Sequence, residues 1–217
     1  MNAFWKSALR TPEGAVLLAG LSLSLGLAAA LVVTALWSAK AAQLLAGLVA
    51  TNLVFGRVAA MSLGYATGLD VFTVVLANAL IETILVLLFY PLFLFSWRQL
   101  LDVRRFGSYL RAVRASAERH KETISRYGLL GLFLFVWSPL WMTGPVVGCA
   151  IGILLGIAMR VTLSVVLAGT YVAILGWALV ILHLHEQVAR ASSLGPLMVL
   201  VAVVIMTAAA YWLRHRN

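Results

Sequence analysis

The chain has 217 residues, of which 63% are hydrophobic and only 11% are charged, and its mean hydropathy is +1.03. A soluble domain carries about 25% charged residues, so these figures argue against a soluble enzyme, a disordered chain and a disulfide-stapled secreted domain. The net charge of +9 does not indicate a nucleic-acid reader, because membrane proteins gather basic residues in loops beside the cytoplasmic leaflet. The composition predicts an integral membrane protein.

Apolar runs, cut at charges and at Pro or Gly, predict helices of two lengths. Runs long enough to span a membrane, which takes roughly 20 residues, cover 15–39, 71–97, 161–182 and 196–213. Four shorter runs cannot cross a core of about 30 Å, and they form two pairs. Gly56 and Arg57 separate 41–55 from 58–69, and residues 138–144 separate 127–137 from 145–157.

Each pair of short runs predicts a re-entrant hairpin, which persists at membrane depth when it is buried in protein or lines a cavity. The segment 98–126 carries eight Lys or Arg against three acids, which predicts a cytoplasmic location. Placing both termini in the cytoplasm then puts every basic cluster inside. The fold class is therefore an all-α polytopic membrane protein with about three full transmembrane spans, two re-entrant helical hairpins and a last span. We expect a single membrane domain over 1–217 in a bacterial or archaeal inner membrane.

An internal repeat supports this arrangement. Three glycines of the first half are matched by glycines 88 residues later in the second half: Gly56, Gly64 and Gly68 by Gly144, Gly152 and Gly156. After an apparent insertion of three residues, 72–78 aligns with 163–169. Because the two hairpins enter from opposite faces, these halves would be inverted repeats, an architecture typical of secondary transporters with a site near the midplane.

The second half also carries a family signature over 126–148. The resemblance is strong over 126–169 and extends more weakly over about 41–182. The fitting residues are Tyr127, Gly128, Gly131, Phe135, Val136, Pro139, Leu140, Thr143, Gly144 and Gly148. This pattern resembles the small multi-drug export protein family, which is related to the DedA/VTT (SNARE-associated) membrane proteins. Two departures stand out: Trp141 and Met142 replace a Pro and a Gly of the motif, and the family's acid beside the first hairpin's Arg57 is absent. The resemblance implies a transporter or translocator of lipids or amphipathic small molecules, with proton coupling.

Three polar residues of the first half are candidates for substrate binding or coupling. Glu82 lies near the middle of 71–97, where a carboxylate must be protonated, paired or facing a polar cavity. Arg57 keeps its proton and so requires an anion or carbonyl partners. Its alternatives are a phosphate headgroup or an internal pair with Glu82 or Asp70. Asn78, one turn before Glu82, forms either a polar cavity wall or an interhelical hydrogen bond.

Three residues of the second hairpin complete the predicted site. Pro139 breaks the helix, and Thr143 and Gly144 leave backbone groups free to hold an anion, unless they form a tight buried turn. The glycine pairs Gly64/Gly68 and Gly152/Gly156 have the four-residue spacing that favours close helix packing.

No catalytic residues, metal site or cofactor are predicted. His183 and His185 do not share a helix face, which disfavours a metal, and no phosphate loop or nucleophile–base pair is present. The segment 98–126 reads either as an amphipathic helix on the cytoplasmic leaflet or as a solvated connector. The expected partners are membrane lipids, a second copy or a larger membrane complex. Two functions stay open: a translocator of the DedA-like type, and a non-transporting accessory subunit of a larger membrane complex.

Overall fold

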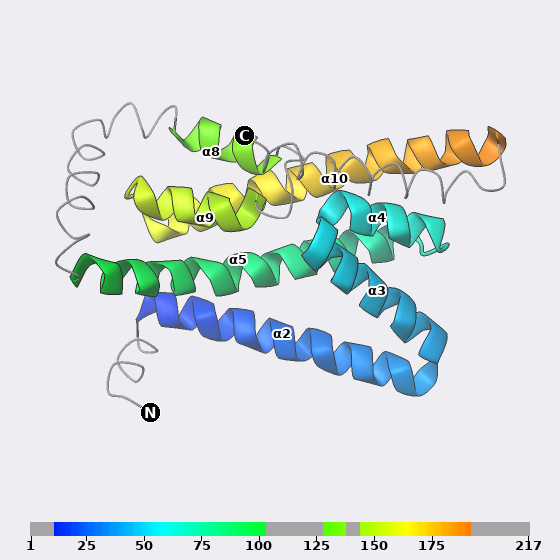
Figure 1. Cartoon of the computed structure of the whole chain (residues 1–217), viewed down its shortest axis with the longest axis horizontal. Coiled ribbons are helices and arrows are strands. Elements are labelled where there is room, and N and C mark those ends of the chain that lie inside the picture. Colours follow the sequence, from blue (N-terminus) through cyan, green and yellow to red (C-terminus); the bar gives the residue numbers. More distant parts are fainter. Residues whose placement is uncertain (1–10, 103–127, 138–143, 192–217) are drawn as a thin grey trace, which may run out of the picture. The chain divides into compact units, whose positions relative to one another are not determined.

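The computed structural model describes residues 11–102, 128–137 and 144–191. Throughout these residues the regular structure is helical, without strands, as the composition predicts. The helices follow one another in the order shown in Figure 1: α2 (Pro12–Trp37), α3 (Ala39–Phe55), α4 (Arg57–Ala66), α5 (Val71–Asp102), α8 (Leu129–Trp137), α9 (Gly144–Leu154) and α10 (Met159–Ala191).

Three of these helices are long and apolar enough to cross a membrane: Pro12–Trp37, Val71–Ser96 and Met159–Leu184. Each has 26 residues, which corresponds to about 39 Å of helix against a hydrocarbon core of about 30 Å. The expected runs 15–39, 71–97 and 161–182 are thus confirmed as long helices. The fourth run, 196–213, lies outside the described residues, as does most of the basic segment 98–126.

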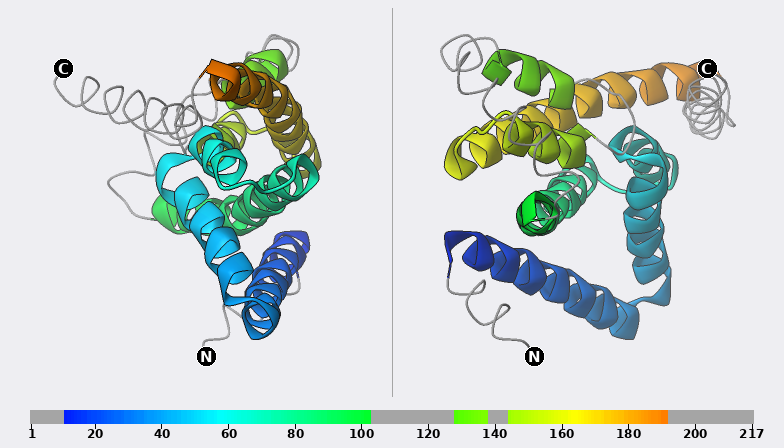
Figure 2. Two further views of the ribbon diagram at one scale, coloured as in Figure 1. Left: turned by 90° about the vertical axis from the view of Figure 1, so that its right-hand side faces the viewer. Right: turned by 60° about the vertical axis from the view of Figure 1, so that its left-hand side comes forward.

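The four short runs are short helices, as predicted from their length. The longest of them, α3, has 17 residues, and the other three have 9 to 11. They form two packed pairs, α3 with α4 and α8 with α9. Figure 2 shows, from two directions, the sharp change of chain direction between α2 and α3 and again between α3 and α4.

The chain divides into two compact units. The first combines Met1–Gly26 with Glu82–Thr170. Its core consists of Val86, Tyr90, Leu132, Val136, Cys149 and Val166. The start of α2 joins this unit because Gly20 lets it approach α5 closely: a Cβ on Gly20 would lie 3.0 Å from the Cδ2 of Leu88.

The second unit combines Leu27–Ile81 with Tyr171–Asn217. The residues of α3, α4 and early α5 that lose all exposure in it are Leu48, Ala59, Ala60, Met61, Ser62, Val74 and Asn78. Three of these seven are small residues on the 10-residue helix α4. Small side chains let two helices pack closely where no water is present to drive association.

The helices α4 and α9 end in the same way. Gly68 and Gly156 both adopt positive φ, 80° and 67°. In the first, Gly68 N–H bonds Tyr65 O and Leu69 N–H bonds Gly64 O. At the end of α9 both bonds recur 88 residues later: Gly156 N–H bonds Ile153 O, and Ile157 N–H bonds Gly152 O. Glycine is favoured at such a left-handed cap because other residues pay a steric cost there.

This geometry corrects two sequence-based expectations. Gly68 and Gly156 are helix caps with open space around them and are not points of close helix contact. Of the four glycines in these two pairs, Gly64 and Gly152 make the close contacts. The expected three-residue insertion before the following helices is also wrong. Helix α5 begins at Val71 and α10 begins at Met159, which keeps the separation at 88 residues.

Asp70 caps the N-terminus of α5. The Thr73 backbone N–H donates to Asp70 Oδ2 at 2.8 Å, and the Thr73 hydroxyl donates to Oδ1 at 2.6 Å. The side-chain hydrogen bond first, and the backbone one second, lower the pKa of the Asp70 carboxyl because they favour its charged form. The cap therefore depends on an ionised carboxylate at the solvent-exposed end of the helix.

We expect this cap to make the protein less stable in acid. Because the folded-state pKa lies below the ordinary value of 3.8, the contribution of Asp70 is complete above that pH and is lost as the pH falls through the lowered pKa. The substitution Asp70→Asn keeps a capping oxygen but does not titrate. Its thermal unfolding midpoint in mild detergent should therefore change less with pH below 3.8 than that of the wild type. An identical acid dependence in both proteins would show that the cap contributes nothing.

Candidate functional site

The break between α3 and α4 lies at Gly56. Its backbone, with φ 84° and ψ 176°, occupies a region that is essentially restricted to glycine. The Gly56 N–H donates to Asn52 O at 2.9 Å, which closes the last turn of α3. The sequence placed the break here, and the structure confirms it.

Arg57 follows this break directly as the first residue of α4. Its side chain is only 6% exposed. A guanidinium stays charged in proteins, so its burial between apolar helices requires compensating polar or anionic groups. The break at Gly56 thus carries a permanent positive charge into the interior of the unit.

Asn52 and Asn78 join α3 to α5 through a buried hydrogen bond. Asn52 Nδ2 donates to Asn78 Oδ1 at 2.7 Å, and Asn78 Nδ2 donates to the backbone oxygen of Val74 at 2.7 Å. Asn52 is 2% exposed and Asn78 is fully buried. Of the two alternatives for Asn78, the interhelical hydrogen bond is present.

Gly64 explains why the two amides meet. A Cβ on Gly64 would lie 2.5 Å from Val74 Cγ2 and 3.3 Å from Leu48 Cδ1, so α4 touches both α5 and α3 here. Asn78 and Asn52 lie four residues after Val74 and Leu48, on the next turn of the same helix faces. The close approach at Gly64 therefore holds α3 and α5 at hydrogen-bonding distance one turn away.

Asn52 was missed by sequence reasoning. Its signal was available: it is the amide nearest the helix break, four residues before Gly56, inside a run without charges. In an apolar environment an amide needs a partner, so an unexplained Asn beside a predicted break points to a polar contact. What the sequence could not supply was the identity of that partner, Asn78, 26 residues further on.

Glu82 lies one helical turn after Asn78 on α5 and belongs to the other compact unit. It is 4% exposed, and the next turn of the helix contributes Val86 to the apolar core of that unit. An ionised carboxylate in such a place costs several kcal/mol unless it is compensated. Glu82 thus lies within a helix of spanning length, as the run 71–97 predicted, and its role in coupling stays a prediction.

The second half is described only in part. Gly144 is the buried first residue of α9, while Pro139 and Thr143 lie outside the described residues. Further along α9, a Cβ on Gly148 would lie 2.6 Å from Val136 Cγ2, and one on Gly152 would lie 2.2 Å from Thr162 Cγ2. The pair Gly152 and Thr162 thus repeats the contact of Gly64 with Val74 at the 88-residue separation.

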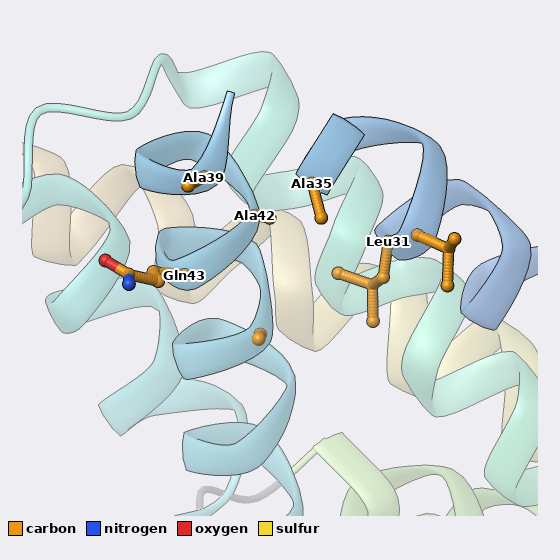
Figure 3. Close-up of a pocket in the computed structure, with 7 residues that line it drawn as sticks. Leu31, Ala35, Ala39, Ala42 and Gln43 are labelled. Atoms are coloured by element: carbon orange, nitrogen blue, oxygen red, sulfur yellow. The ribbon is translucent and has the colours of Figure 1, made fainter. Parts of the chain in front are cut away.

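A groove of about 410 Å³ lies where α2 meets α3 (Figure 3). Its lining is Leu31, Val32, Ala35, Ala39, Ala42, Gln43 and Ala46. Only Gln43 among these has a polar side chain. The groove therefore offers apolar contact and no group for proton transfer or charge recognition.

Three helices of spanning length, two of which hold buried polar side chains, define a multi-pass membrane protein. The chain belongs to the family described as "Putative small multi-drug export protein", whose model matches residues 57–175. The match begins at Arg57 and includes Asn78, Glu82 and Gly144. No curated protein and no solved structure matches the chain. A family of export proteins favours a transporter over an enzyme.

Proposed function

We propose that this protein is a DedA-like translocator that moves a lipid or an amphipathic small molecule across the membrane. The observation that carries the proposal is the burial of Arg57 at the helix break between α3 and α4. A permanent charge is costly at such a position, and in membrane proteins such residues mark substrate or ion pathways. Membership of an export family supports the same conclusion.

The proposed architecture is a pair of inverted repeats with α3–α4 and α8–α9 as re-entrant hairpins. At about 14 to 26 Å, none of these helices is long enough to cross the core. Their identical end caps and the constant 88-residue separation support a repeat. One spanning helix and one basic segment separate the hairpins, so they enter from opposite faces, with both termini in the cytoplasm of a bacterial or archaeal cell.

In this mechanism the two buried ionisable residues have separate tasks. Arg57 binds an anionic or carbonyl oxygen of the substrate through its guanidinium N–H groups. Glu82 takes up a proton on one side of the membrane and releases it on the other. In the second hairpin, an anion is held by backbone groups of Pro139, Thr143 and Gly144. In the first hairpin, Asn78 orients α3 on α5.

Purified protein in liposomes tests the role of Arg57. The probes are phosphatidylglycerol labelled with a fluorophore on one acyl chain, followed by chemical quenching, and ethidium accumulation. Loss of a charge-assisted hydrogen bond costs about 1.5–3 kcal/mol, so Arg57→Met should slow translocation of the phosphatidylglycerol probe, whose phosphate supplies the oxygen, by about tenfold to a hundredfold. Ethidium carries no oxygen for Arg57 to bind and should be less affected. Arg57→Lys keeps the charge but not the planar guanidinium. Its translocation rate should lie between those of the wild type and Arg57→Met.

The matched control is Lys40→Met, which removes an exposed cation from α3. It should leave translocation unchanged. A folded Arg57→Met protein that translocates phosphatidylglycerol at the wild-type rate would remove the basis for the proposed function.

A second candidate function is an accessory subunit of a larger membrane complex. The most apolar 18-residue stretch of α2 is only 11% buried, and its end exposes Leu36 (80%) and Trp37 (89%) beside the apolar groove. Under this alternative, purification in mild detergent yields a partner in fixed stoichiometry. Arg57→Met then has no effect on translocation, whether it releases the partner or leaves it bound.

A further inference from the structure

The amide pair Asn52–Asn78 presents a hydrogen-bond acceptor and not a donor. The backbone oxygen of Val74 accepts from Asn78 Nδ2, which turns Asn78 Oδ1 toward α3. Asn52 must then offer its Nδ2 to that oxygen, and it does so at 2.7 Å. The oxygen of Asn52 is the group left over. It is buried and has no hydrogen-bond partner among the described residues.

An interhelical link accounts for the hydrogen bond between the two amides but not for the unpartnered oxygen of Asn52. Burying an amide oxygen without a partner lowers stability. The second half of the chain has apolar residues at the two corresponding positions. Leu140 lies 88 residues after Asn52, and Val166 lies 88 residues after Asn78. Val166 is fully buried in the apolar core of its unit. The second half thus uses an apolar residue on α10 where α5 has Asn78.

We propose that Asn52 and Asn78 form a recognition point for a hydrogen-bond donor, an N–H or O–H group, on the molecule that the protein binds. This inference rests on the proposed function and specifies its ligand. The free oxygen of Asn52 accepts from the ligand, while Asn78 holds Asn52 in the required orientation. The oxygen is enclosed in this structure, so the donor reaches it when the side chains that cover it move aside while the hydrogen bond between Asn52 and Asn78 is kept. The donor belongs either to a lipid headgroup or to an amphipathic cation.

Two probe pairs, each matched in charge, distinguish these sources. Phosphatidylethanolamine and phosphatidylcholine are both zwitterionic, but only the first carries N–H donors. Ethidium and tetraphenylphosphonium are both lipophilic cations, and only ethidium carries N–H groups. The measurement is the shift of the thermal unfolding midpoint of the purified protein in detergent as each probe is titrated, because a ligand of the folded state stabilises it.

We expect one donor-bearing probe to bind the wild type about tenfold more tightly than its donor-free partner, the effect of one buried hydrogen bond. The double variant Asn52→Leu with Asn78→Val, which copies the apolar residues of the second half, should fold and bind both members of the pair equally. A preference within the lipid pair identifies a headgroup as the source, and a preference within the cation pair identifies a small molecule.

Equal binding of both members of each pair by the wild type would overturn the inference, and this result needs no variant. A preference that persists in the folded double variant would overturn it as well. Translocation is scored separately in liposomes. A wild type that prefers the donor-bearing probe in the binding measurement but moves none of the four probes would refute the proposed function while leaving the recognition point in place.

Discussion

Replacing Gly152 by alanine is expected to destabilise the protein by roughly 1–3 kcal/mol, the usual cost of overpacking a buried contact. The added Cβ would lie 2.2 Å from Thr162 Cγ2 and 2.8 Å from Thr162 Oγ1. Threonine is branched at Cβ and has few alternative rotamers in a helix, so it cannot move aside cheaply. Helix α9 must therefore shift away from the start of α10. Denaturant titration in mild detergent, followed by circular dichroism, measures the loss.

Two further variants give this prediction its controls. Gly176→Ala introduces the same methyl group into α10, where nothing lies within 4 Å, and it should leave stability unchanged or raise it slightly, because alanine favours the helix. Adding Thr162→Ala to Gly152→Ala removes both of the nearest atoms and should recover part of the loss. Equal effects of Gly152→Ala and Gly176→Ala would mean that α9 and α10 do not make this contact.

Neutralising Glu82 is expected to abolish the response of translocation to a pH gradient while preserving the fold. Glu82→Gln keeps the shape and the hydrogen-bonding oxygen of the side chain but cannot carry a proton. The variant should therefore move substrate in a gradient only as fast as it does without one. The variant's stability in detergent should stay near that of the wild type, because glutamine keeps an oxygen that accepts hydrogen bonds and places no charge in the apolar core.

The assay uses liposomes with an imposed pH difference and the probe that the wild type accepts. Asp70→Asn is the matched control, because it removes a carboxylate that is exposed at the start of the same helix. Asp70→Asn should keep the gradient response. A response of wild-type size in the Glu82→Gln protein would exclude Glu82 as the proton carrier and would leave an uncoupled translocator as the remaining form of the proposal.

The division into long and short helices could be predicted from the sequence because membrane thickness sets a minimum length. A run of about 20 apolar residues crosses the core and one of 10 to 17 does not, so the lengths of the runs and the glycine at position 56 predicted α2 to α5 closely. The burial of Arg57 and Glu82 could be predicted for a related reason. A charge inside an apolar run cannot face lipid at low cost, so it must turn toward protein.

The roles of the glycines could not be predicted from their spacing. Gly64 and Gly68 have the spacing of a close helix contact, yet only Gly64 makes one and Gly68 adopts positive φ at a cap. Both roles select glycine, one because Cβ would clash and the other because Cβ disfavours the backbone conformation. The sequence shows that a glycine is present but not which of the two roles it has. The spacing therefore led to the prediction of close helix packing for all four glycines.

By itself, then, the sequence determined the membrane environment, the lengths of the helices, the break at Gly56 and the burial of Arg57 and Glu82, because each follows from the cost of placing polar groups in lipid. Only the tertiary structure decided that Asn52 pairs with Asn78 and that the 88-residue separation continues into α5 and α10. Both depend on which helix faces meet in space. A pairing 26 residues apart leaves no periodic trace in an apolar chain, since any of several faces satisfies the same pattern.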